Sequence, residues 1–504
     1  MHRPSTRPIA CAVAPTRGGR PVSRGPGSPI RRAEGVATGL ALGLLAGVLA
    51  GCGPGEPAPG IVLVVLDTLR ADRLGCLGGP RPASPHLDAL AAEGVLFEEA
   101  VAHASWTLPS MAALLAGRLP TATVFDGRLR ESLVEQLADA GFETAAFTEG
   151  GYVSATFGLD LGFGLFREQE GEVGLFRGGG EAGKGGIERT FAAAVAWLGQ
   201  VGDRPFFLLV HTYEVHAPYR RRHFARDPPP PGLGPTFELA DVLRIRRGLL
   251  PVGPREQAWL EALYDGGVLE ADRHVGELDF ELRRLGLAGR TTLAVTSDHG
   301  EDLGGRFPNY AGDHGHALYE EQIRVPLLLR GPGLPAGRRI RDPVRLVDLL
   351  PTLLEIAGLA PPPGLDGRSL LPLLRGGDPP PPETLLRTTG EAGKPARVGL
   401  RSGRFKLVVS DPLAHPRTPS MELFDLEHDP AERHNLAEEE PELRARLRAR
   451  LRTLRTRERT EGPPRYALPR ELPAELEARL RALGYLPPSA PGRSGGAGRP
   501  SSTP

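Results

Sequence analysis

The chain has 504 residues, 40% hydrophobic but only 6% aromatic, so leucine, valine and alanine must supply the core of one large and one smaller domain. Its 61 basic and 61 acidic residues cancel, which excludes a globally basic nucleic-acid binder.

The N-terminus has the layout of an export signal. A basic stretch ending at Arg32 precedes an apolar run from Val36 to Leu49, which is shorter than the roughly 20 residues that span a bilayer. The run ends Leu-Ala-Gly-Cys at Cys52, which resembles the lipobox of bacterial lipoproteins. That resemblance implies a signal peptide over 1–52, lipidation of Cys52, a tether over 53–59, and an exported, membrane-anchored protein of the bacterial cell envelope that faces the periplasm or the exterior. An ordinary signal peptide with a chance cysteine is the alternative.

Three apolar runs predict buried parallel strands, and each ends at polar residues. Ile61–Leu66 is followed by Asp67, Phe206–Val210 by His211, and Leu293–Val295 by Asp298 and His299 shortly after. Helical patterns alternate with these runs, which predicts a doubly wound α/β domain with a mostly parallel sheet over residues 60–378. The helical patterns cover 84–93, 110–116, 133–140, 264–285 and 346–357.

A proline-rich break at 379–382 marks a domain boundary. Beyond it, 398–409 has the pattern of two strands with a turn at Ser402-Gly403, and 421–426 that of a third strand. Helical patterns follow at 439–459 and 472–486. We therefore predict a smaller C-terminal antiparallel sheet with helices over 385–486, then a disordered tail over 487–504.

The polar residues after the strands suit hydrolysis of an anionic ester. Asp67, Asp298 and His299 offer oxygen and nitrogen ligands for a divalent metal ion, and Thr107 offers a hydroxyl nucleophile between them in the sequence. Carboxyl ends of strands are where open α/β sheets place such groups.

Motifs along residues 60–440 resemble the sulfatase family of the alkaline phosphatase superfamily. The resemblance rests on the segments 67–75, 84–97, 105–118, 214–219, 298–301, 314–327, 348–354, 365–370 and 422–436. It implies an alkaline-phosphatase-like fold, and it assigns roles to single residues. The metal ligands would be Asp67, Asp298, His299 and Thr107; the catalytic residues Thr107, His216 and His316; and further substrate or second-metal residues His211, Glu214 and His314.

The chain departs from the family at the nucleophile. Sulfatases that use formylglycine have Cys or Ser where this chain has Thr107, and Arg where it has Met111. Threonine cannot be oxidised to that aldehyde, so no formylglycine is expected. Thr68 replaces a second Asp, and His299 replaces the commoner Asn, which favours zinc or manganese over calcium at one site, with a second site left open.

Three functions remain open at this stage. The first is a sulfuric ester hydrolase at the cell envelope, acting on a small-molecule or glycan sulfate ester. The second is a phosphodiesterase or phosphotransferase of the same superfamily that uses Thr107. A silent binding protein is the third, and the joint presence of five residues argues against it: Asp67, Thr107, Asp298, His299 and His316.

Overall fold

The computed structural model describes residues 58–119, 124–125, 128–169, 186–379, 383–388, 397–410, 421–460 and 472–482. The predicted signal peptide, Cys52, most of the tether and the tail 487–504 lie outside these residues, so those assignments stay predictions. Within the described part of the chain, no helix combines the length and the apolar character that crossing a bilayer requires.

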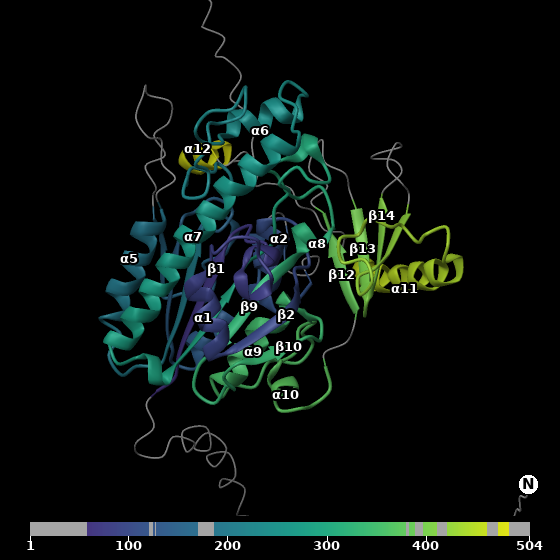
Figure 1. Cartoon of the computed structure of the whole chain (residues 1–504). Coiled ribbons are helices and arrows are strands. Elements are labelled where there is room, and N and C mark those ends of the chain that lie inside the picture. The colour runs from purple at the N-terminus through teal and green to yellow at the C-terminus, as the bar shows by residue number, and fades with distance from the viewer. Residues whose placement is uncertain are drawn as a thin grey trace, which may run out of the picture. The chain divides into compact units, whose positions relative to one another are not determined.

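A nine-stranded sheet forms the centre of the molecule (Figure 1), in the order β10-β2-β9-β8-β1-β7-β5-β6, with β11 also paired to β2. Only β9 runs antiparallel to its neighbours, β2 and β8; all other pairs are parallel. The strands are β1 (Gly60–Leu66), β2 (Val95–Val101), β5 (Glu143–Thr148), β6 (Leu165–Glu168), β7 (Phe206–Thr212), β8 (Thr291–Thr296), β9 (Arg324–Arg330), β10 (Arg338–Ile340) and β11 (Val344–Arg345).

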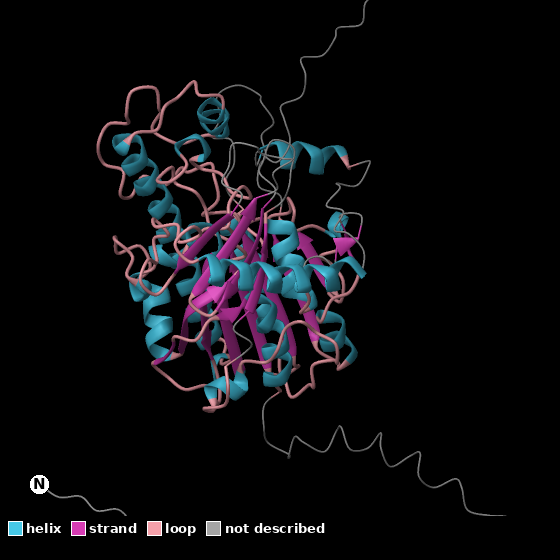
Figure 2. Ribbon diagram, turned by 90° about the vertical axis from the view of Figure 1, so that its right-hand side faces the viewer, coloured by secondary structure: helices cyan, strands magenta, loops and turns pink. Residues whose placement is uncertain are grey.

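Both faces of this sheet are buried. Every residue of β1 is buried, and its side chains alternate between two apolar clusters, with Val64 in one and Leu63 in the other. Figure 2 shows helices on both sides of the strands. One cluster includes α1 (Pro85–Glu93), α5 (Ile187–Leu198), α6 (Leu239–Arg246) and α7 (Pro254–Arg284); the other includes α2 (Thr107–Ala116), α4 (Val134–Asp139), α9 (Leu349–Ile356), α10 (Leu371–Leu374) and α12 (Ala474–Ala482).

A separate four-stranded antiparallel sheet follows in the order β12-β13-β14-β15. It comprises β12 (Glu383–Arg387), β13 (Arg397–Ser402), β14 (Phe405–Ser410) and β15 (Met421–Asp425), and α11 (Pro441–Thr460) packs leucines against it. The backbone of Arg387 in β12 bonds His103 and Ser105 of the main domain. The smaller sheet therefore contacts the segment that leads into Thr107.

The fold class predicted from the sequence is confirmed: a mostly parallel sheet with helices, and a smaller antiparallel sheet with a helix. Several details differ from expectation. The helix predicted from Ser110 begins at Thr107, the helix predicted from Tyr264 begins at Pro254, and α5 and α6 are among the helices that were not predicted. Leu476 and Leu480 of α12 pack in a cluster of the main sheet instead of the small one. Two short elements complete the described chain: α8 (Glu320–Ile323) before β9, and a hairpin of β3 (Val124–Phe125) and β4 (Arg128–Leu129).

Candidate active site

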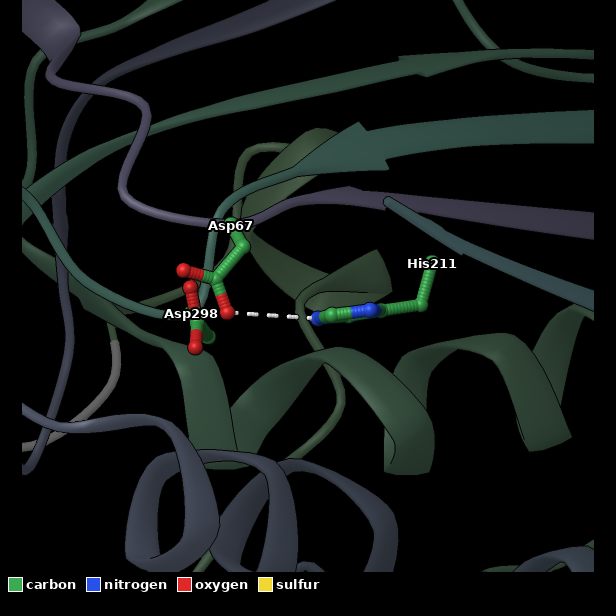
Figure 3. Close-up of side chains that lie close together, drawn as sticks. All are labelled: Asp67, His211 and Asp298. Carbon is green, nitrogen blue, oxygen red and sulfur yellow. Dashed lines mark ion pairs between the residues drawn. The ribbon is translucent and has the colours of Figure 1, made fainter. Parts of the chain in front are cut away.

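The carboxyl ends of three neighbouring strands bring the site together. Asp67 follows β1, His211 lies near the end of β7, and Asp298 follows β8. The register aligns Val65 of β1 with His211 on one side and with Thr296 on the other. One ligand atom from each of Asp67, His211 and Asp298 lies within 4.8 Å of the other two, and Figure 3 shows the three side chains converging.

Backbone amides hold the carboxylate of Asp298. The amides of Thr68 and His299 donate to its Oδ1 atom over 3.3 and 2.9 Å. Thr68 takes a left-handed conformation with φ of 60°, and the Tyr264 hydroxyl donates to its carbonyl over 2.7 Å. A non-glycine residue with positive φ is uncommon and costs energy, so the surrounding contacts must fix this turn. Oδ1 of Asp298 is therefore occupied by hydrogen bonds, and Oδ2 has none among the described residues.

Thr107 stands at the first position of α2, beside these groups. Its hydroxyl donates to Asp67 Oδ2 over 3.2 Å and lies 3.2 Å from His299 Nε2. His299 Nδ1 faces the carbonyl of Gly300 at 2.8 Å. Because a carbonyl only accepts, Nδ1 carries the proton and Nε2 presents its lone pair to Thr107. The partial positive charge of a helix N-terminus favours negative charge on this oxygen.

The buried polar atoms fit a divalent cation. Asp67 Oδ1, Asp298 Oδ2 and both ring nitrogens of His211 are buried without a hydrogen-bond partner among the described residues. Burial, and then the neighbouring charge of Asp298, raise the pKa of Asp67 well above its ordinary value. Burial lowers the pKa of His211 to about 4, which leaves its imidazole neutral at pH 7. One free oxygen on each of two carboxylates and a neutral imidazole form a donor set that a metal ion would satisfy.

Two further histidines lie next to this cluster. The His314 ring centroid is 4.4 Å from that of His299 and 5.0 Å from that of His216. His314 Nδ1 lies 3.0 Å from Glu301 Oε1, so the carboxyl group fixes the orientation of the ring. Burial, followed by the charge of Asp313, raises the pKa of Glu301 well above its usual range.

Comparison with known proteins shows the family of the chain. The protein-family model described as Sulfatase matches residues 59–359, more than half of the chain. The chain belongs to the sulfatase family. A second model, described as N-sulphoglucosamine sulphohydrolase, C-terminal, matches residues 312–457 of this sulfatase-family member.

Curated relatives agree with this membership. Arylsulfatase K of Mus musculus is 35% identical over 196 residues, which cover 36% of this chain and 34% of the relative. Steryl-sulfatase of Mus musculus is 30% identical over 416 residues, 64% of this chain and 66% of the relative. The chain thus aligns with about a third of the length of arylsulfatase K.

Solved structures share the fold at low identity. The phosphonate monoester hydrolase of Agrobacterium radiobacter superposes with a TM-score of 0.61 at 23% identity, covering 79% of this chain and 96% of that one. A protein solved in complex with its substrate D-glucosamine-2-N,6-O-disulfate has a TM-score of 0.64 at 20% identity, covering 81% and 99%.

The structure gathers some of the predicted residues and separates others. Asp67, Thr107, Asp298 and His299 meet in one site. The ring of His314 lies against His299, and the ring of His216 lies against His314. The side chain of His316 has other partners, with Nε2 at 3.1 Å from Asp302 Oδ2 and its ring stacked on Tyr310. Glu214 receives a hydrogen bond of 2.8 Å from Arg221 Nε.

The sequence had placed His211 only among the weaker candidates. Its position at the end of a buried run was visible, but the pairing of β7 with β1 was not, and that pairing places the imidazole beside Asp67.

Proposed function

We propose that this sulfatase-family member is a metal-dependent hydrolase of sulfate esters that uses Thr107 as its nucleophile. The observation that supports it most is the position of Thr107 Oγ1. That atom lies 3.2 Å from both Asp67 Oδ2 and His299 Nε2, at the N-terminus of α2.

Asp67, Asp298 and His299 are the residues that would hold the metal ion. A bound divalent cation would offset the charge of the ester oxygens and favour the ionised form of a nearby hydroxyl. Both carboxylates are fully buried and each retains an oxygen without a hydrogen-bond partner in the described structure.

The remaining chemistry falls to side chains of the chain itself. Thr107 Oγ1 attacks sulfur, its proton passes to Asp67 Oδ2, which already accepts its hydrogen bond, and the bond from sulfur to the leaving oxygen breaks. We assign to His314 the role of the acid that protonates the leaving oxygen, because Glu301 holds its Nδ1 atom in place. Water then attacks the sulfothreonine at sulfur, which releases sulfate and restores the hydroxyl. His314 replaces His316 in this role because His316 is turned towards Asp302.

The proposed substrate is a sulfated small molecule or glycan at the cell envelope. Its sulfated character is supported by family membership and by the similar structure that holds a glucosamine disulfate. The location rests on the lipobox-like sequence before Cys52.

A second candidate, a phosphodiester or phosphonate ester, is favoured by Thr107 itself. Threonine lacks the second hydroxyl of an aldehyde hydrate, so its ester can be cleaved only by attack of water at the central atom. Phosphorus undergoes such a displacement in many enzymes. One similar fold is that of a phosphonate monoester hydrolase.

A panel of substrates with one shared leaving group tests the proposal. Purified protein lacking residues 1–52 is given 4-nitrophenyl sulfate, bis(4-nitrophenyl) phosphate and 4-nitrophenyl phenylphosphonate with each of Zn²⁺, Mn²⁺ and Ca²⁺. We expect hydrolysis of the sulfate ester by the wild type. Thr107→Ala should lower kcat/KM by at least about 1,000-fold. Thr453→Ala, which changes an exposed threonine on α11, should keep the wild-type kcat/KM. Preferential hydrolysis of a phosphorus ester selects the second candidate, and wild-type activity in Thr107→Ala rejects both.

A further inference from the structure

His211 occupies an unusual environment for an imidazole. It is fully buried at the end of β7, and neither ring nitrogen has a hydrogen-bond partner among the described residues. Its Nε2 atom lies 3.4 Å from Asp67 Oδ2, and Figure 3 shows the ring edge directed at the two carboxylates. Buried polar groups are almost always satisfied, so the unpartnered Nε2 that faces the carboxylates calls for a partner of another kind.

The other atoms of the site point to a cation as that partner. Asp67 Oδ1 and Asp298 Oδ2 are buried and equally without hydrogen bonds among the described residues. With His211, these two residues form a group in which one ligand atom of each lies within 4.8 Å of the others. A proton shared between His211 and Asp67 would satisfy one nitrogen and leave Asp298 Oδ2 unchanged. A single metal ion satisfies atoms on all three side chains.

The resulting donor set contains two imidazoles. His299 Nε2 lies 3.4 Å from Asp298 Oδ2, and its lone pair faces the site because Nδ1 bonds a carbonyl. Two nitrogen and two carboxylate ligands suit zinc and related transition metals, whereas calcium prefers six to eight oxygen ligands. We propose that His211 is a ligand of the metal ion in this site, and that the site therefore binds Zn²⁺ in preference to Mn²⁺ and both in preference to Ca²⁺. This inference rests on the metal site of the proposed function and gives it a ligand and an ion.

A second group of metal-ligand side chains, Glu188, Glu270 and His274, does not compete for this assignment. Arg273 Nη2 lies 2.6 Å from Glu270 Oε1 and 2.7 Å from His274 Nε2. A guanidinium thus already occupies the position that an ion would take. His274 is nevertheless a buried histidine, which makes it a matched control for His211.

Direct metal binding to the full chain in detergent tests the proposal without any substrate. The protein is stripped with chelator, and affinities for Zn²⁺, Mn²⁺ and Ca²⁺ are measured by competition with a chromophoric chelator and by calorimetry. We expect His211→Gln to weaken Zn²⁺ binding by at least about 100-fold and to change Ca²⁺ binding by less than about threefold, while His274→Gln keeps wild-type affinities. X-ray absorption of the zinc-loaded wild type should show two imidazole ligands, and His211→Gln one.

The following results would overturn the assignment of His211 as a metal ligand. Wild-type Zn²⁺ affinity in His211→Gln removes His211 from the ligand set. Tighter binding of Ca²⁺ than of Zn²⁺ by the wild type refutes the selectivity, as does a single imidazole in the absorption spectrum. If His211→Gln fails to fold, His211→Asp supplies an oxygen in its place, and an unchanged Zn²⁺ to Ca²⁺ preference in that variant also refutes the proposal. If zinc binding is confirmed but hydrolysis does not depend on Thr107, the proposed reaction is rejected and the assignment of this metal site is retained.

Discussion

Without metal, the Asp67→Asn variant should be more stable than the wild type. With bound metal, the wild type should be the more stable of the two. Asp67 and Asp298 present carboxylate oxygens no more than 4.8 Å apart, and both side chains are fully buried. Two unit charges at 4.8 Å repel by about 3.5 kcal/mol at an effective dielectric constant of 20. Without metal, burial and this repulsion raise the pKa of Asp67, so the repulsion opposes folding where Asp67 is ionised, and the gain from Asp67→Asn grows as the pH rises. The new amide nitrogen can also donate to Asp298 Oδ2, which has no hydrogen-bond partner.

The repulsion sets the scale of the expected change. At about 2 °C per kcal/mol for a chain of this size, relief of the full repulsion raises the Tm of the metal-free variant by up to about 7 °C. Metal acts in the opposite direction, because a ligand at 100 times its Kd stabilises the native state by about 2.7 kcal/mol, or about 5 °C. Asp67→Asn loses most of this gain together with its ligand charge.

Thermal unfolding with chelator and with added Zn²⁺ measures both effects. The control is Asp272→Asn, because Asp272 is equally buried but accepts hydrogen bonds from the amides of His86 and Leu87. The control should lower Tm in both conditions and retain the metal response. A lower Tm for Asp67→Asn than for the wild type in chelator would refute the charge argument, and an undiminished metal response would refute the ligand assignment.

Three further changes test other parts of the molecule. Asp348→Ala leaves the buried guanidinium of Arg345 without its carboxylate and should cost about 3 to 5 kcal/mol in urea unfolding; a loss below about 1 kcal/mol contradicts this. Gly300→Ala places a Cβ in steric conflict with the backbone carbonyl of Glu321, so we expect metal affinity to fall at least about tenfold as the turn after His299 shifts. Unchanged affinity would show that the turn adapts freely. Cys52→Ala should release the protein from the membrane fraction and abolish acylation detected by mass spectrometry, whereas continued membrane attachment would reject the lipobox assignment.

Local sequence patterns determined most of the elements. The apolar run of β1 and the helical spacing of α1 and α9 depend on neighbouring residues, so they could be read from the chain alone. The start of α2 could not, because Thr107 to Pro109 carry no strong N-capping signal, and no side chain caps the helix. The start of α7 was missed by ten residues, although Pro254 at the first helical position is a known start signal.

The sequence by itself also supplied the residues proposed for the chemistry: Asp67, Asp298 and His299 after buried strands, and Thr107 between them in the chain. Tertiary structure decided which of the histidines join them. His211 and His316 each lie in a segment rich in candidate ligands, yet the pairing of β7 with β1 turns one towards Asp67, while contacts with Asp302 and Tyr310 hold the other away. Strand order and loop packing depend on contacts between residues more than a hundred positions apart, and no pattern within either segment encodes them.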